Sequence, residues 1–128
     1  MQPMSETEET IGRSIAKTHF ALGRFLNGVF QRAGHDLTRE QWVTLKLLGC
    51  CGPTHQQDIA TKLDKDKFSV TKLVDGLEKR GLVERRPSAE DRRKKIIHLT
   101  EESEPLTPKL EALVDNALKR VTAGIAPE

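Results

Sequence analysis

Basic side chains are concentrated between Lys62 and Lys95. This stretch carries twelve basic and seven acidic residues, a net charge of +5, whereas residues 1–61 are neutral and residues 96–128 carry −3. Clustered lysine and arginine side chains neutralise phosphate groups, so such a patch is typical of a nucleic-acid-binding surface. The alternative is a charged face that only contacts solvent. The secondary structure that carries the charge distinguishes a nucleic-acid-binding surface from such a face.

The basic stretch lies in a segment whose pattern is helix, turn, helix and hairpin. Residues Thr54–Leu63 predict a short helix, and Asp64–Lys67 predict a charged turn. A second helix over Phe68–Arg80 has one apolar face, and Gly81 ends it. The apolar face is made by Val70, Leu73, Val74 and Leu77.

A β-hairpin is predicted after Gly81. Residues 82–86 and 94–99 have strand character, and the charged tip 87–93 joins them. A helix-turn-helix followed by a hairpin with a basic tip has the shape of a module that binds duplex DNA.

A long helix is predicted before this module. Ser5 or Thr7 caps it, it runs to about Ala33, and Gly34 ends it. Three internal glycines weaken the helix, so tertiary or intersubunit packing must support it. The apolar stripe is longer than a small winged domain can cover, which indicates a partner helix. The residues that recur at steps of three and four and form one stripe along this helix are Ile11, Ile15, His19, Leu22, Leu26 and Val29.

Two further helices complete the prediction. Thr38 caps a helix that runs to about Leu48, with Gln41 completing a capping box. The last helix spans 101–123, and Pro105 and Pro108 predict a kink or a delayed start. Its apolar stripe is Leu106, Leu110, Leu113, Val114, Ala117, Leu118 and Val121.

These elements predict one mostly α-helical domain over residues 1–128 with a small β-hairpin wing. The winged helix-turn-helix core covers about 37–100. Outer helices at about 7–33 and 101–123 form a shared dimer layer. We expect a cytoplasmic protein without membrane contact, because no secretion signal and no apolar run of about 18 residues is present.

Three segments in the same order resemble the multiple-antibiotic-resistance regulator (MarR) family of bacterial transcription factors. They are Leu37–Leu45, Ser69–Arg85 and Asp91–Thr100, and the resemblance covers roughly residues 11–120. It implies a homodimer that binds pseudo-palindromic operators in double-stranded DNA, often represses, and releases DNA when a small ligand or an oxidant arrives. Members usually have a further C-terminal helix, which would begin about where this sequence ends.

The resemblance implies that the helix from Phe68 to Arg80 enters the major groove, where base edges distinguish all four base pairs. It also implies that Arg93 contacts the minor groove while Asp91 holds its guanidinium group. An inconsequential surface ion pair is the alternative there. The predicted DNA-binding residues are Lys67, Ser69, Thr71, Lys72, Arg85, Arg86, Asp91, Arg92, Arg93 and Lys94.

The remaining candidates for chemistry are weaker. Trp42 could line the family's ligand pocket, with His19 nearby, but simple core and interface roles fit both residues. Cys50 and Cys51 are expected to be buried or inert, since they follow a helix C-terminus and the nearest basic residue in sequence is Lys46; a redox sensor is the alternative. No metal-ligand spacing is present, and none is expected.

The resulting hypothesis is a homodimeric, ligand- or stress-responsive transcriptional regulator. Its rival is a winged-helix module for protein–protein interaction, which would not need so basic a wing. No phosphate-binding glycine loop and no nucleophile–base motif is present, so neither enzymatic activity nor a cofactor is expected. The effector, the operator, the target genes and the sign of regulation are not encoded in any motif.

Overall fold

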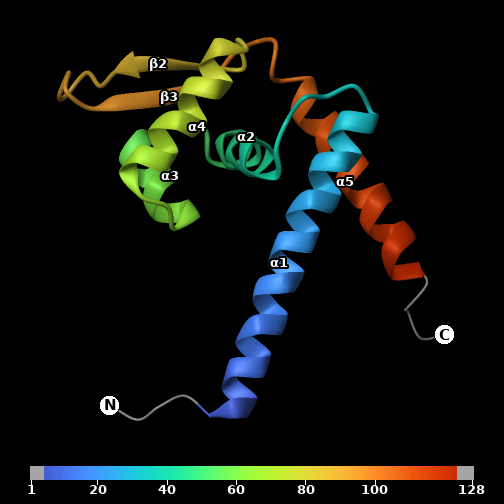
Figure 1. The fold of residues 1–128 in the computed structure, drawn as a ribbon. Coiled ribbons are helices and arrows are strands. Elements are labelled where there is room, and N and C mark those ends of the chain that lie inside the picture. The colour runs from blue at the N-terminus through green and yellow to red at the C-terminus, as the bar shows by residue number, and fades with distance from the viewer. Residues whose placement is uncertain (1–4, 124–128) are drawn as a thin grey trace. The chain divides into compact units, whose positions relative to one another are not determined.

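The computed structural model describes residues 5–123. In chain order the elements are α1 (Glu6–Arg32), α2 (Arg39–Cys51), β1 (Thr54–His55), α3 (Gln56–Leu63), α4 (Lys67–Lys79), β2 (Val83–Pro87), β3 (Lys95–Leu99) and α5 (Leu106–Ala123). The chain divides into two compact units, with the boundary between Arg39 and Glu40. The mostly helical fold with a small hairpin is therefore confirmed (Figure 1).

The first unit is built around α1. Ser5, one of the two predicted caps, is the N-cap of this helix: its hydroxyl accepts the Glu8 amide, and the Glu8 carboxylate accepts the Ser5 amide. The helix ends at Arg32, and Gly34 follows with φ +86°. That left-handed conformation suits a glycine and lets the chain turn away from the helix axis.

The second unit contains the winged helix-turn-helix. α3 contacts α4, β1 and β3, and α4 contacts β2. Its core is apolar, because one face of each helix and one face of the sheet point inward. Fully buried members are Leu45, Ile59, Val74, Leu77 and Ile97.

The sheet has three antiparallel strands in the order β1-β3-β2. The β2–β3 hairpin was predicted, and its register pairs Val83 with Leu99 and Pro87 with Lys95. The third strand was missed: Thr54 and His55, predicted as the start of a helix, pair instead with Ile97 and Ile96. Two residues are too few to show an alternating pattern, so only the pairing partner reveals this strand.

α2 is longer than predicted. It was expected to stop near Leu48, before Gly49, but it continues through Gly49, Cys50 and Cys51. Gly52, with φ +76°, follows the last turn. A glycine within a helix is tolerated when tertiary packing supports the backbone, so the first glycine of the pair was the wrong terminator.

α5 starts late, as the two prolines predicted. Residues 101–105 form turns, and the helix begins at Leu106, directly after Pro105. Pro108 then falls in the first turn, where its missing amide hydrogen has no helical acceptor to lose. The Ser103 carbonyl accepts the amides of Leu106 and Thr107 at 3.2 Å each.

Candidate nucleic-acid interface

The turn between α3 and α4 fixes the direction of α4. Asp64 has φ 52° and ψ 49°, a left-handed conformation that aspartate tolerates better than most residues. Asp66 then caps α4, because its two carboxylate oxygens accept the amide and the hydroxyl of Ser69 at 2.8 Å each. These hydrogen bonds from Ser69 lower the pKa of Asp66. The left-handed conformation of Asp64 and the hydrogen bonds between Asp66 and Ser69 together define where α4 starts.

The outer face of α4 presents the cations that were predicted to contact DNA. Lys67 and Lys72 are exposed. The other two predicted contacts on this helix have partners inside the unit: the Ser69 hydroxyl belongs to the Asp66 cap, and the half-buried Thr71 accepts a hydrogen bond from Gln56 Nε2 at 3.1 Å. Phe68, which was not among the predicted site residues, is 79% exposed on this helix.

The tip of the wing holds Arg93 in a defined conformation. Asp91 Oδ1 accepts the Arg93 backbone amide at 3.0 Å and its Nε at 3.2 Å, and Oδ2 accepts Nη2 at 3.4 Å. The hydrogen bonds from the Arg93 side chain and backbone lower the pKa of Asp91. The predicted Asp91–Arg93 pair is therefore present, and the Arg93 side chain is still 91% exposed.

Arg85 differs from the other wing arginines because its guanidinium group is bound inside the unit. Nε donates to Gln56 Oε1 at 3.0 Å, Nη2 donates to the Thr71 carbonyl at 3.2 Å, and Nη1 lies 2.6 Å from Asp75 and 3.0 Å from Glu78. Only 17% of the side chain is exposed. The phosphate contact predicted for Arg85 is corrected, because its donors already have acceptors on α3 and α4.

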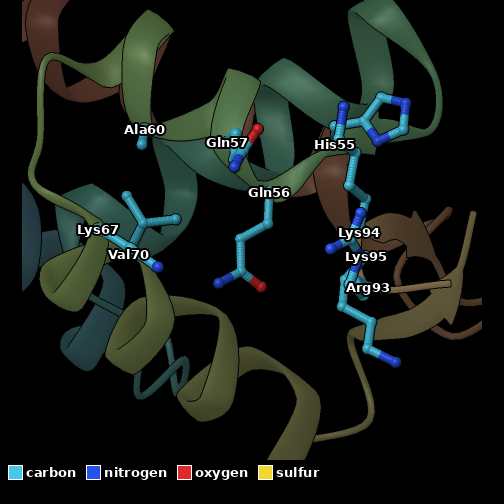
Figure 2. A pocket seen from close by; sticks show the side chains of 9 residues that line it. All are labelled: His55, Gln56, Gln57, Ala60, Lys67, Val70, Arg93, Lys94 and Lys95. Carbon is cyan, nitrogen blue, oxygen red and sulfur yellow. The ribbon is translucent and has the colours of Figure 1, made fainter. Parts of the chain in front are cut away.

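The other predicted wing cations remain on the surface. Arg86 pairs with Glu84 at 3.0 Å, and both side chains are about half exposed. Arg92 and Lys94 are exposed, and so is Lys95, which was not among the predicted site residues. Lys95 opens β3 and points to the same region as Lys94 in Figure 2.

A hollow of about 410 Å³ lies between α3, α4 and the wing. Figure 2 shows Lys67 and Val70 of α4 on one side of it, the wing residues on the other, and Gln56 pointing into the space between. The Nδ1 atom of His55, the last residue of β1, is buried here without a hydrogen-bond partner among the described residues. The cations that line this hollow are Lys67, Arg93, Lys94 and Lys95.

The two predicted ligand-pocket residues have local contacts. His19 is exposed on α1 and meets the Phe20 ring edge-on, with 6.2 Å between ring centroids. Trp42 is buried in α2, and the Lys46 ammonium lies 5.3 Å from the centroid of its ring. A ligand pocket formed by His19 and Trp42 stays a prediction.

The cysteines were expected to be buried or inert; both are exposed, so they are not buried, and their inertness stays a prediction. They form the last two residues of α2, as the helix extends further than predicted. The cation beside Cys51 is Lys62, whose Nζ lies 3.8 Å from Sγ. Lys46, the nearest basic residue in sequence, pairs instead with Glu111 at 3.8 Å.

Metal-binding clusters and membrane-spanning helices are both absent from residues 5–123. No group of three or more histidine, cysteine, aspartate or glutamate side chains there is placed to hold a metal ion. No helix in this range is long and apolar enough to cross a membrane.

The sequence that forms this arrangement matches a known protein family. Residues 37–95 match the sequence profile of the MarR family; they include α2, the helix-turn-helix, β2 and the wing tip, and end at the first residue of β3. Over this stretch the chain has the sequence pattern of a MarR-family domain. MarR-family proteins are transcriptional regulators.

Solved structures extend the MarR-type fold over most of the chain. BldR from Sulfolobus solfataricus superposes with a TM-score of 0.81 at 21% identity, over 94% of this chain and 86% of BldR. A cysteine-to-serine mutant of MarR from E. coli, complexed with operator DNA, superposes with a TM-score of 0.80 at 24% identity, over 94% of this chain and 87% of the mutant. Reduced AbfR bound to DNA superposes with a TM-score of 0.77 at 21% identity, over 84% of this chain and 77% of AbfR.

Proposed function

We propose that this protein is a sequence-specific DNA-binding transcriptional regulator. It acts in the cytoplasm as a homodimer on pseudo-palindromic operators and responds to a small-molecule or stress signal. The observation that carries the proposal is the set of exposed cations on two sides of one hollow: Lys67 on α4, and Arg93, Lys94 and Lys95 on the wing. Double-stranded DNA offers phosphates along both edges of a groove, and this spacing of cations is suited to it.

The two elements have different roles in this proposal. α4 enters the major groove, where Lys72 contacts a base edge or a phosphate. Arg93 enters the adjacent minor groove, whose negative potential favours a planar, permanently charged guanidinium group. Asp91 limits the conformations of Arg93, so the side chain gives up less entropy on binding. Arg86, Arg92 and Lys94 contribute phosphate contacts.

Two complexes of structurally similar proteins support the proposal. E. coli MarR has been solved with operator DNA and AbfR with DNA, and each superposes on most of this chain. The rival function, a winged-helix module that binds only proteins, does not account for a wing with this density of exposed cations.

Selection of duplexes from a random pool by the purified protein tests the proposal. Enriched sequences should contain two related half-sites, and fluorescence anisotropy on one of them should give a salt-dependent affinity. We expect Lys72→Ala and Arg93→Ala each to weaken binding and, by removing one positive charge that neutralises the DNA backbone, to flatten the slope of log affinity against log salt by about one unit. Lys109→Ala, which removes an exposed cation from α5, is the matched control and should bind as the wild type does.

The outcomes separate the proposal from its rival. If no duplex is enriched, the interaction-module function is favoured. If a duplex is enriched but both substitutions bind it normally at two salt concentrations, α4 and the wing are not the DNA-binding surface.

The proposed sign of regulation is repression. A reporter promoter that overlaps the selected operator should be less active when the protein is present. Higher activity with the protein would instead indicate an activator.

A further inference from the structure

Phe68 is an apolar side chain in an unusual place. It is 79% exposed and is the second residue of α4, next to the exposed Lys67. The other large hydrophobic side chains with substantial exposure in residues 5–123 lie on α1 and α5. Within the winged helix-turn-helix, the exposed phenyl group is thus found at the start of the helix that is proposed to enter the major groove.

The turn of the helix places Phe68 opposite the core. Val70, Val74 and Leu77 are buried and mark the inward face of α4. At 3.6 residues per turn, Phe68 and Lys72 are one turn apart and point away from that face. The apolar ring and the lysine ammonium group are therefore presented to the same outside surface.

This position does not serve the fold. The Asp66 carboxylate, rather than an apolar contact, fixes the start of α4, and the phenyl ring adds nothing to the buried core. Phenylalanine is also a poorer helix former than the lysine beside it. A contact outside the chain explains the residue better than one inside it.

The charge around Phe68 indicates what covers it. Lys67, Lys72 and the wing cations favour a polyanion over a second apolar protein surface. In the major groove of DNA, thymine exposes an apolar 5-methyl group, and phenylalanine is one of the side chains that contact it. The first turns of a recognition helix are the part that reaches base edges.

We propose that Phe68 is a specificity-determining residue that selects thymine by packing its ring against the 5-methyl group in the major groove. The inference rests on the proposed DNA-binding function. Lys67 and Lys72 supply affinity for the backbone or an adjacent base, and Phe68 supplies the preference for thymine at one position of each half-site.

Uracil substitution tests this contact directly, because deoxyuridine pairs as thymidine does but lacks the methyl group. The probes are a duplex that the purified protein selects from a random pool and copies of it with deoxyuridine at one thymidine at a time. We expect one position in each half-site to lose about fourfold in affinity, which corresponds to one buried methyl-sized group. Other positions should show no change.

The variants assign the effect to Phe68. Phe68→Ala should bind thymidine and deoxyuridine duplexes equally, whereas Lys72→Ala should weaken both and keep the ratio between them. Circular dichroism should show an unchanged fold, because the ring is outside the core. Phe68→Leu, which keeps an apolar side chain, should retain part of the preference.

Each contrary outcome has its own meaning. Equal affinity of the wild type for all substituted duplexes overturns the inference and leaves the proposed function standing, as does an unchanged ratio in Phe68→Ala. If Phe68→Ala alters the sedimentation coefficient of the protein without DNA, the ring contacts protein instead, and the inference is wrong. If no duplex is enriched at all, the proposed function and the inference both fail.

Discussion

Arg85 and Arg93 lie on the same wing and have opposite relations to the rest of the unit. Among residues 5–123, Arg93 is held by Asp91 alone, two residues away, and it presents nearly all of its side chain to solvent. Arg85 connects β2 to α3 and α4 through Gln56, Thr71 and two carboxylates. The first arginine is available to a ligand, whereas the second orients the wing relative to the helix-turn-helix.

Arg85→Ala should therefore lower stability and should not remove a phosphate contact. Hydrogen bonds to charged groups contribute about 1.5–3 kcal/mol, and the substitution leaves several acceptors without their partner, so we expect a decrease of about 2 kcal/mol in the free energy of unfolding in urea. Arg86→Ala is the matched control: its pair with Glu84 is on the surface, and pairs of this kind contribute about 0–1 kcal/mol.

DNA binding gives a second readout for Arg85. If the residue positions the wing, Arg85→Ala should weaken operator binding while the slope of log affinity against log salt stays that of the wild type. Arg93→Ala should flatten the slope by about one unit. A flattened slope for Arg85→Ala would restore the original expectation of a phosphate contact.

The cysteines give another prediction at the scale of single residues. Both thiols are exposed, so both should react with a thiol-titrating reagent in the folded protein without denaturant. Exposure alone does not make a thiol control DNA binding. We expect the Cys50→Ser, Cys51→Ser double variant to respond to hydroperoxide as the wild type does in an operator-release assay. Release by the wild type alone would identify a thiol-based sensor.

The distance along the chain explains which side-chain pairs the sequence could predict. The Asp91–Arg93 pair spans two residues in a tight hairpin tip, so its geometry is almost fixed by the local pattern. The Arg85–Gln56 hydrogen bond joins residues 29 apart, and nothing in either segment indicates the other. Phe68 was missed for a different reason: only charged and hydroxyl side chains were considered as contacts to DNA.

At the scale of elements, the cap of α4 controls the helix that is proposed to contact DNA. Asp66 accepts two hydrogen bonds from Ser69. A carboxylate at a helix N-terminus is also stabilised by the helix dipole. Because Thr71, Lys72 and Phe68 follow within the next two turns, fraying of this end would displace the candidate contacts.

The lowered pKa of Asp66 predicts how the stability of α4 depends on pH. A carboxyl whose folded pKa is depressed stabilises the fold above its unfolded pKa of about 3.9, and this stabilisation disappears as the pH falls through the lower folded value. Asp66→Asn keeps an oxygen acceptor but does not titrate. The free-energy difference between wild type and this variant should therefore shrink below about pH 4 in chemical unfolding.

Asp66→Ala distinguishes the contribution of the capping hydrogen bonds to stability from that of the carboxylate charge. It removes the acceptor altogether, so it should be less stable than both wild type and Asp66→Asn at neutral pH. Equal stability of the alanine and asparagine variants would show that the cap does not stabilise α4.

Element boundaries were predictable where a local signal is strong. The Ser5–Glu8 capping box, Gly81 after α4 and the proline-delayed start of α5 all depend on residues within one turn of the boundary. β1 and the end of α2 depend on contacts with distant residues: Thr54 pairs with Ile97, and the α2 backbone continues past Gly49. Tertiary structure overrides propensity at those two places.

At the scale of the whole molecule, apolar side chains remain exposed on both outer helices. Ile11, Ile15 and Phe20 on α1 and Leu118 and Val121 on α5 are all exposed. Leu26 and Leu110, which were predicted to contribute to the dimer layer, are already buried within one chain. The exposed residues are therefore the better candidates for contact with a second copy.

Dimerisation is the prediction that depends on this surface. Burying one such side chain contributes about 1.5–3 kcal/mol, so a few of them support a dimer at micromolar concentration, which analytical ultracentrifugation can measure. Ile15 is 65% exposed and lies on the helix face that also carries Ile11 and Leu26, so Ile15→Glu should give a folded monomer. Lys79→Glu, which introduces the same charge at an exposed position on α4, outside both outer helices, should remain dimeric. A wild type that sediments as a monomer throughout the micromolar range, or a dimer that tolerates Ile15→Glu, would rule out this face of α1 as the interface.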